Sequence, residues 1–277
     1  MDLNTVRQVK SPSSVDDIAD WPAGHAWLSG GTWLMSEPQP GIDTLVDLFG
    51  LDWPALVASE EGLEIAATAT IGALADFSAP PDWTAAPLLR ACAHALLMSF
   101  KVADVATVGG NICMSLPAGA MVSLTVALEA TYVLWPRAGA PRTVGAAEFV
   151  TGNHANVLGS GELLRAIHIP AAALKRRFAL RRASLTKLGR SAALLIGTCG
   201  PQGDLVLTIT AATPRPVQLR FAAMPGAEEL QAALAAAIPA DGWFDDVNGT
   251  PAYKRHLTVH FAEEIRAELA AESGGTA

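Results

Sequence analysis

The fold of this chain is organised around the stretch Asp104-Val-Ala-Thr-Val-Gly-Gly-Asn-Ile-Cys113. An apolar run precedes it, a small polar turn from Thr107 to Asn111 occupies its centre, and a second apolar segment follows. Gly109 and Gly110 lack a Cβ atom, so the backbone there can approach a ligand closely or adopt a positive φ. Neighbouring amides in such a turn can point the same way and form a nest for an anion. Most Gly-Gly pairs are only tight turns, so this stretch alone leaves both interpretations open.

A second glycine pair of the same kind occurs in Trp27-Leu-Ser-Gly-Gly-Thr-Trp-Leu34. Its small-residue centre also lies between apolar segments. Neither stretch is a P-loop, because no Gly-Lys-Ser/Thr follows, and neither contains the Gly-x-Gly-x-x-Gly dinucleotide pattern. Two Gly-Gly loops of different sequence could hold the two phosphates of one pyrophosphate from opposite sides, and we adopt this interpretation.

The motifs, taken in order, resemble those of a known family. Ser29-Gly-Gly-Thr32 resembles its Ala-Gly-Gly-Thr/His loop, and Ala106-Thr-Val-Gly-Gly-Asn111 resembles its Ala-Thr-Ile-Gly-Gly-Asn loop. Ser115-Leu-Pro-Ala-Gly119 resembles the Ser-Pro-Ala-Gly segment that follows. Gly161-Glu-Leu-Leu164, leading to Ile167-His-Ile-Pro170, resembles the Gly-Glu-Leu-Leu…Ile-x-Ile-Pro strand. The family is the FAD-binding medium subunit of molybdenum hydroxylases, which include carbon monoxide dehydrogenase and xanthine dehydrogenase, and the resemblance runs over most of the chain.

The resemblance implies an α+β fold, with a two-lobed FAD-binding domain of the PCMH type followed by an α+β C-terminal domain. We expect lobe 1 at about residues 1–55, lobe 2 at about 56–172 and the C-terminal domain at 173–277. In the first domain the sequence pattern predicts strands at 44–48, 63–70, 131–135 and 163–169, and helices at 86–100 and 122–130.

The pattern changes after the expected boundary between residues 170 and 177. Strands at 178–183, 192–197, 205–210 and 214–219 predict a three- or four-stranded antiparallel sheet. Helices are expected at 228–238 and 256–271, the second with its charges on one side. This arrangement also matches the C-terminal domain of the resembling family.

In that family the FAD pyrophosphate lies against both Gly-Gly loops, which implies cofactor contacts at the matching residues here. These are Ser29, Gly30, Gly31, Thr32 and Trp33 in the first loop and Thr107, Val108, Gly109, Gly110 and Asn111 in the second. Amide dipoles and hydroxyl donors can hold two phosphates without a net positive charge. Leu164 stands where the family has an apolar residue in contact with the flavin.

Some positions depart from the family's pattern and affect individual cofactor contacts. Ala120 stands where the family usually has an Asp that contacts the cofactor, nine positions after the loop Asn. The family also tends to place a Lys or Arg on the first strand of the C-terminal domain. Arg181 is the nearest candidate, and Arg182 is equally possible. Ala103-Asp104 replaces the usual Arg-Asn before the second loop.

Basic residues gather after the expected domain boundary, at 175–177, at 181–182, at Lys187 and at Arg190. They could hold an anionic partner or a nicotinamide dinucleotide, or they could form a solvated surface between the domains.

Composition excludes several classes of protein. The chain has 277 residues, of which 51% are hydrophobic and 17% charged, so it can build a sizeable core. A formal net charge of −8 argues against a broad nucleic-acid surface. No apolar stretch is long enough to span a membrane.

Cys92, Cys113 and Cys199 are scattered without metal-ligand spacing, so we expect no metal or iron–sulfur cluster in this chain. Scattered cysteines and a start from Met1 without a signal-peptide pattern are typical of a cytoplasmic protein.

The sequence thus predicts an FAD-dependent electron-transfer subunit of an oxidoreductase complex. The resemblance implies partners: a [2Fe-2S] small subunit, a molybdenum-cofactor large subunit that oxidises the substrate, and an acceptor such as NAD, a quinone, an electron carrier or oxygen. No side chain is needed as an acid or base, because the flavin supplies the chemistry. Two alternatives stay open: a flavin-free scaffold subunit, suggested by Ala120, and a nucleotide-binding regulatory protein.

Overall fold

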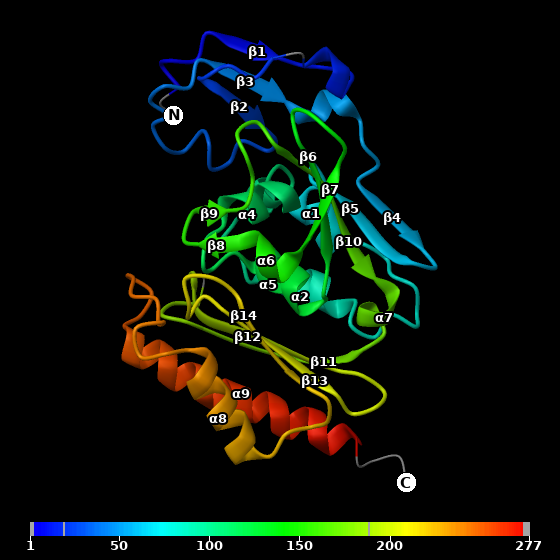
Figure 1. Ribbon diagram of the computed structural model, residues 1–277, viewed down its shortest axis with the longest axis vertical. Coiled ribbons are helices and arrows are strands. Elements are labelled where there is room, and N and C mark those ends of the chain that lie inside the picture. The colour runs from blue at the N-terminus through cyan, green and yellow to red at the C-terminus, as the bar shows by residue number, and fades with distance from the viewer. Residues whose placement is uncertain (1–2, 19, 188, 274–277) are drawn as a thin grey trace.

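The computed structural model describes residues 3–18, 20–187 and 189–273. Three larger sheets follow one another along the long axis of the molecule, from an N-terminal part through a central part to a C-terminal part (Figure 1). Helices pack between and beside these sheets, so the α+β class expected from the sequence is confirmed.

The N-terminal part is a small parallel sheet of strand order β1-β3-β2. Its buried side chains are few, and Leu48 and Leu51 form a small core with Leu163 of the central part. The predicted strand at 44–48 is confirmed as β3. The elements are β1 (Gln8–Lys10), η1 (Val15–Asp17), β2 (His25–Leu28), β3 (Thr44–Asp47) and η2 (Leu48–Leu51).

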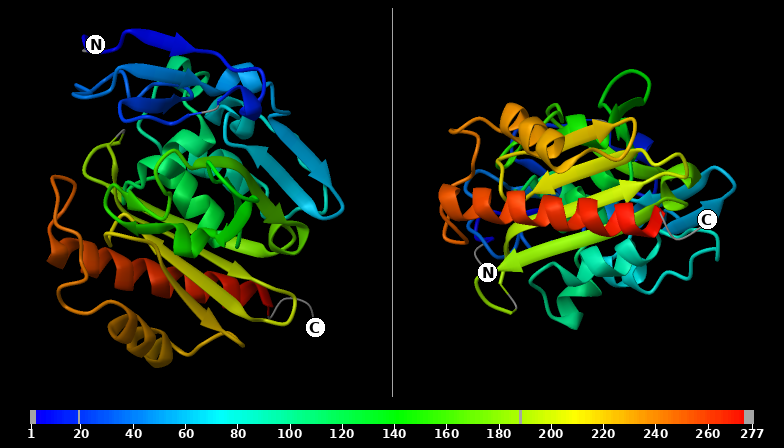
Figure 2. Two further views of the ribbon diagram at one scale, coloured as in Figure 1. Left: turned by 45° about the horizontal axis from the view of Figure 1, so that its top comes forward. Right: turned by 90° about the horizontal axis from the view of Figure 1, so that it is seen from below.

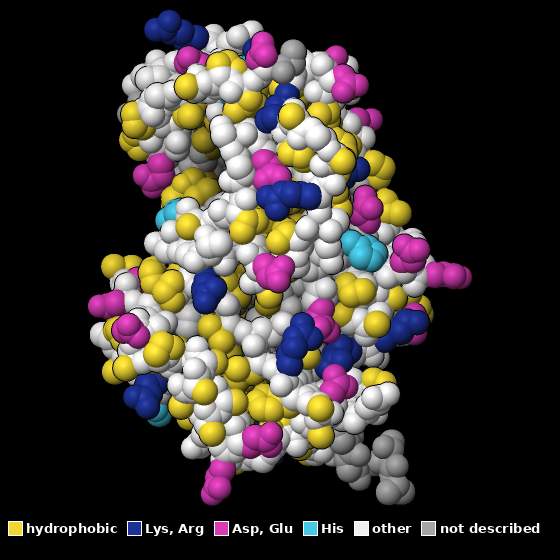
Figure 3. Space-filling view, in the orientation of Figure 1, with side chains coloured by type: hydrophobic (Ala, Val, Ile, Leu, Met, Phe, Trp, Pro, Cys, Tyr) yellow, Lys and Arg dark blue, Asp and Glu magenta, His cyan; other side chains and the backbone are white. Residues whose placement is uncertain are grey.

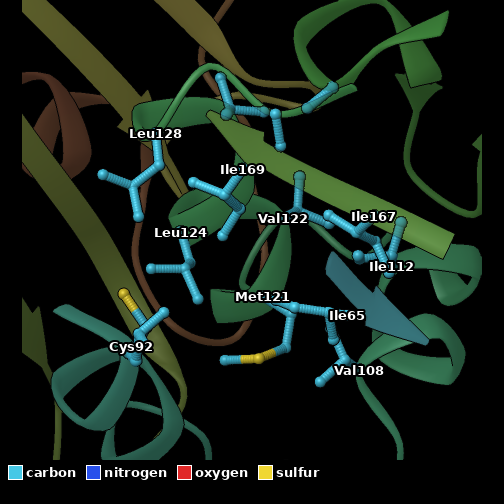
Figure 4. Close-up of a cluster of buried hydrophobic side chains, with 14 of the residues drawn as sticks. Ile65, Cys92, Val108, Ile112, Met121, Val122, Leu124, Leu128, Ile167 and Ile169 are labelled. Carbon is cyan, nitrogen blue, oxygen red and sulfur yellow. The ribbon is translucent and has the colours of Figure 1, made fainter. Parts of the chain in front are cut away.

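The central part is a five-stranded antiparallel sheet of order β4-β5-β10-β6-β7 that shares a large core with its helices. Every residue of α5 is buried, and Figure 4 shows its Met121, Val122 and Leu124 among side chains of the sheet and of α4. The strands are β4 (Leu56–Ser59), β5 (Gly62–Ala66), β6 (Thr131–Trp135), β7 (Arg142–Gly145), β8 (Val150–Gly152), β9 (Ala155–Asn156) and β10 (Leu163–Pro170). The helices are α1 (Ile71–Ala75), α2 (Pro87–His94), α3 (Phe100–Ala103), α4 (Val108–Met114), α5 (Ala120–Ala127), α6 (Ala146–Phe149) and α7 (Ala171–Leu174).

The segment from Thr107 to Asn111 is not a free turn but the start of α4. Thr107 is the N-cap residue, and its Oγ1 accepts a hydrogen bond of 3.1 Å from the amide of Gly110. A Cβ atom at Gly109 would lie only 2.5 Å from the Cβ of Ala67. The glycine therefore lets the helix pack its backbone directly on the segment after β5, and this contact outweighs the low helix propensity of glycine.

The predicted helix at 86–100 is shorter than expected. α2 ends at His94, and the separate turn α3 begins after Ser99, whose Oγ accepts from the amide of Val102 at 3.4 Å. The predicted strand at 63–70 is likewise shortened to β5, because Thr70 caps α1. Capping side chains thus determine where these helices begin, which the pattern of apolar residues did not predict.

The C-terminal part is a four-stranded antiparallel sheet of order β11-β12-β13-β14, which confirms the predicted sheet. The helices α8 and α9 cover one face, and Figure 2 shows α9 lying over the sheet, roughly along its strands. The other face packs on the central part, where Leu194 and Ile196 join its core. No helix among the described residues is both long and apolar enough to cross a membrane. The elements are β11 (Arg177–Ser184), β12 (Ser191–Cys199), β13 (Leu205–Thr210), β14 (Val217–Phe221), α8 (Ala227–Ala237) and α9 (Pro251–Ser273).

Candidate functional site

A cleft of about 760 Å³ brings together residues from all three parts of the molecule. This volume lies within the range of small-molecule and cofactor sites. Figure 3 shows the surface hollowed between the N-terminal and central parts. The lining includes residues 29–34 of the first Gly-Gly loop, Thr107 and residues 109–111 of the second, Leu164 of β10, and Arg190, Phe244 and residues 246–248 of the C-terminal part.

The two Gly-Gly loops meet in this cleft although they are far apart in the sequence. Oγ of Ser29 lies 2.9 Å from Oγ1 of Thr107. A Cβ atom at Gly30 would lie 2.0 Å from the carbonyl oxygen of Val105, so the two backbones are in direct contact. Glycine at position 30 is what allows this approach.

The first loop presents a row of unpaired amides. Within the described residues, the N–H groups of residues 29–34 donate to no protein acceptor. Gly31 has a φ of +66°, a left-handed conformation that turns the backbone here. Consecutive unpaired amides at such a turn form a concave site for an anion.

The second loop differs from the expected nest because its amides already have acceptors. Val108 and Gly109 donate to the carbonyl oxygens of Ala69 and Ala67, at 2.9 and 3.0 Å. The amide of Asn111 donates to the carbonyl oxygen of Thr107 at 3.0 Å, and that of Gly110 donates to Oγ1 of Thr107. This loop therefore offers the cleft the hydroxyl of Thr107 and the bare backbone of Gly110.

The remaining candidate residues of the second loop and of the segment after it differ in whether they line the cleft. Val108 is fully buried and does not line the cleft. Asn111 lines it, but its Oδ1 accepts from the amide of Met121 at 3.2 Å and so helps to hold the start of α5. Ala120 is fully buried in the first turn of α5 and is not among the lining residues.

Leu164 lines the cleft beside an irregularity in β10. The pairing with β6 shifts between Leu164 and Ala166, which leaves Arg165 as an extra residue. Bulges of this kind often occur next to functional sites, where they redirect a side chain. The guanidinium of Arg165 lies over the ring of Trp53, 4.3 Å from its centroid, and so ties β10 to the N-terminal part.

Arg181 lies outside the cleft, in contrast to the expected cofactor contact. Successive side chains of a strand point to opposite faces, and Arg181 points to the face covered by α9. Its Nε donates to the carboxylate of Glu264 at 2.9 Å, and its other end pairs with Glu268. Arg182 points the opposite way but is also absent from the lining residues. The sequence could not fix this alternation because both residues are basic.

The basic residue that does line the cleft is Arg190, in the connection between β11 and β12. Its guanidinium carbon lies 5.9 Å from the centroid of the Trp33 ring. Trp33 also lies near His154, with 5.8 Å between the ring centroids. The sequence marked Arg190 only as part of a basic cluster.

Lining residues of the segment between α8 and α9 were not anticipated from the sequence. Asp246 is held by Lys254, whose buried Nζ lies 2.8 Å from Oδ1. Val247 follows and is 91% exposed at the rim of the cleft. No local motif marks this segment, because only the packing of the C-terminal part brings it to the cleft.

Glu162 and Cys113 are two titratable groups of the cleft whose pKa values are shifted. The Arg142 guanidinium holds the pKa of Glu162 below its usual range, through two hydrogen bonds of 2.7 Å. Burial raises the pKa of the Cys113 thiol to about 12, so this thiol stays neutral. Among the described residues, no group of three or more His, Cys, Asp or Glu side chains is placed to hold a metal ion.

Comparison with known proteins agrees with this geometry. Residues 5–172 match the model of the family described as the FAD binding domain in molybdopterin dehydrogenase. Among curated proteins, none matches the sequence.

Solved structures of three enzymes share the fold over nearly the whole chain. The match to carbon monoxide dehydrogenase from Oligotropha carboxidovorans has a TM-score of 0.82 and 19% identity, and covers 98% of this chain and 99% of that one. Quinoline 2-oxidoreductase from Pseudomonas putida 86 matches with a TM-score of 0.80 and 19% identity, over 99% of both chains. Carbon monoxide dehydrogenase from Hydrogenophaga pseudoflava matches with a TM-score of 0.80 and 21% identity, over 96% and 98%.

These structural matches show the fold, and the family model covers more than half of the sequence. The resemblance inferred from the two Gly-Gly motifs is thereby confirmed. The chain belongs to the family of FAD-binding domains of molybdopterin dehydrogenases, a family of oxidoreductase components that bind FAD.

Proposed function

We propose that this chain is the FAD-binding electron-transfer subunit of a multi-subunit molybdenum hydroxylase. The observation that supports it most is the meeting of the two Gly-Gly loops in one cleft, joined through Ser29 and Thr107. The matching family binds FAD, and the cleft has the size and the unpaired amides that this cofactor needs. When bound, FAD supplies the electron-transfer chemistry, and the protein positions and tunes it.

The residues of the cleft fit an FAD diphosphate and its rings. The amides of residues 29–34 would hold phosphate oxygens, with the hydroxyl of Ser29, which is hydrogen-bonded to that of Thr107, as a further donor. Gly30 and Gly110 keep the backbone bare where the loops meet. Leu164 would contact the cofactor from the sheet side. Of the other second-loop positions, Gly109 also lines the cleft, whereas Val108 is buried behind this wall.

The electron path implies partners on other chains. We propose a heterotrimer in which a [2Fe-2S] small subunit delivers electrons and a molybdenum-cofactor large subunit oxidises the substrate. The solved relative from Hydrogenophaga pseudoflava is described as lacking the Mo-pyranopterin moiety of its molybdenum cofactor, which supports a molybdenum partner. Electrons would leave to NAD, a quinone, an electron carrier or oxygen.

The proposal predicts that the purified chain binds about one FAD and that Gly110→Val prevents this. A Cβ at Gly110 would lie 2.8 Å from Oγ1 of Thr107, so a valine there disturbs the hydroxyl and fills the adjacent wall of the cleft. We expect FAD affinity to fall by at least about tenfold, measured by flavin fluorescence titration of the apoprotein.

Gly226→Val is the matched control, because a Cβ at Gly226 would have no atom within 4 Å and the residue lies outside the cleft. It should bind FAD like the wild type. Full FAD occupancy in Gly110→Val would show that the cofactor lies elsewhere. A colourless wild-type protein that cannot be reconstituted would favour the flavin-free scaffold, and binding of ADP without FAD would favour the regulatory protein.

A further inference from the structure

The formal charges that line the cleft are paired, with one exception among the described residues. Glu162 is paired with Arg142 at 2.7 Å, and Asp246 with Lys254 at 2.8 Å. Arg190 also lines the cleft, but within the described part of the chain it has no hydrogen-bond or ion-pair partner. It therefore leaves one positive charge available to a ligand, in a chain whose net charge is −8.

This charge lies near the side chain of Trp33, a residue of the first loop. The guanidinium of Arg190 is 5.9 Å from the ring of Trp33, and the amide of Trp33 belongs to the row at residues 29–34. An exposed cation–π contact at this distance is weak, so it orients the side chain without occupying its N–H groups. Unpaired amides and a guanidinium both favour an anion, and here both line the same cleft and are linked through Trp33.

The backbone that carries Arg190 is held on both sides by Arg182. Nε of Arg182 donates to Oγ of Ser191 at 2.8 Å, and a terminal nitrogen donates to the carbonyl oxygen of Gly189. Gly189 itself donates to the carbonyl oxygen of Thr186 at 2.9 Å. The backbone at Arg190 is therefore braced while the side chain stays exposed to the cleft.

We propose that Arg190 binds the diphosphate of FAD, so that the C-terminal domain contributes a phosphate ligand to the cofactor site. The inference rests on the FAD site proposed above. Guanidinium groups pair with phosphate through two parallel hydrogen bonds, and Arg190 supplies the positive charge that the amide row lacks. Arg182 acts as its positioning residue.

The test compares three probes on the apoprotein: FAD, ADP as a diphosphate without flavin, and riboflavin as a flavin without phosphate. Arg190→Ala should weaken the binding of FAD and of ADP by about tenfold to hundredfold, the loss expected when a charge-assisted contact to phosphate is removed, and leave riboflavin binding unchanged. Arg190→Lys should recover part of the loss. The thermal midpoint should not move, because Arg190 is exposed.

Lys187→Ala is the matched control, since Lys187 is exposed on the same connection and does not line the cleft. The proposal is overturned if Arg190→Ala binds FAD like the wild type, or if FAD and riboflavin weaken by the same factor. If Arg190→Ala binds FAD like the wild type but its FAD-loaded form oxidises NADH more slowly, Arg190 would instead bind a phosphate group of the nicotinamide dinucleotide. Failure of the wild type to bind FAD would be a different result and would refute the proposed function itself.

Discussion

At the residue scale, Glu162 shows how the cleft keeps a carboxylate away from an anionic ligand. Its oxygens accept from Arg142, and one of them also accepts from the amide of Gly159 at 2.9 Å. The side chain is 6% exposed, while that of Arg142 is 44% exposed. The negative charge is therefore neutralised inside the protein and does not repel a phosphate group.

This pairing makes part of the stability pH-dependent. Because the pKa of Glu162 is lowered by folding, its contribution is complete above the unfolded value of about 4.5 and is lost as pH falls through the folded value. We expect the free energy of unfolding, measured with urea, to fall more steeply below about pH 5 in the wild type than in Glu162→Gln. At neutral pH the variant should be about 1 kcal/mol less stable. Parallel pH profiles of the two proteins would contradict this assignment.

At the scale of elements, the segment between α8 and α9 is fixed to the sheet by a buried cation. Nζ of Lys254 donates to Asp246 and also to the carbonyl oxygen of Ala211 at 3.2 Å. The amide of Phe244 donates to the carbonyl oxygen of Ala212 at 2.9 Å. These bonds hold Val247 at the rim of the cleft although the segment has no regular structure.

Lys254→Met should keep the apolar stem but leave the carboxylate of Asp246 without its partner. We expect a loss of about 3 kcal/mol in the free energy of unfolding, at the lower end for breaking a buried pair because Asp246 is partly exposed. Chemical denaturation at pH 7 measures it. The double variant Lys254→Met/Asp246→Asn should recover part of the loss. A single variant as stable as the wild type would show that the pair contributes little.

The elements also show what local sequence can and cannot predict. The strands β6 and β13 have the predicted bounds because their side chains follow strand patterns between clear turns. The sequence predicts a turn at the start of α4 because two adjacent glycines disfavour a helix in isolation. Contact with Ala67 explains Gly109, and the hydroxyl of Thr107 lies beside Gly110. The meeting of the two Gly-Gly loops was predicted, whereas the place of Arg190 in the cleft depends on how the C-terminal sheet packs.

At the scale of the whole molecule, the segments before and after the expected boundary near residue 172 pack closely against each other. Oγ of Ser123 in α5 and Oγ1 of Thr210 in β13 lie 2.6 Å apart in the interior. The amide of Ala211 donates to the carbonyl oxygen of Pro117 at 2.8 Å. The C-terminal sheet thus has helices on one face and the central part on the other.

A fragment of residues 1–172 should therefore be much less stable than the full chain. Without the C-terminal sheet, α5 would expose apolar side chains that are now buried on every side. We expect the fragment to aggregate or to unfold without a cooperative transition, as monitored by size-exclusion chromatography and thermal circular dichroism. A soluble fragment with a sharp transition and wild-type FAD affinity would instead establish residues 1–172 as an independent domain.

The contact between Ser29 and Thr107 has a consequence for proton positions. Oγ1 of Thr107 already receives the N–H of Gly110, so its own hydrogen can turn toward Ser29, and the hydrogen of Ser29 then points outward. Such a series is polarised in one direction, from the helix amide to the outer hydroxyl, and each member strengthens the next. An anion bound next to Ser29 favours this direction of the hydrogen bonds. Only the two hydroxyl hydrogens have to rotate, so the site can adjust to a negative charge without moving any heavy atom.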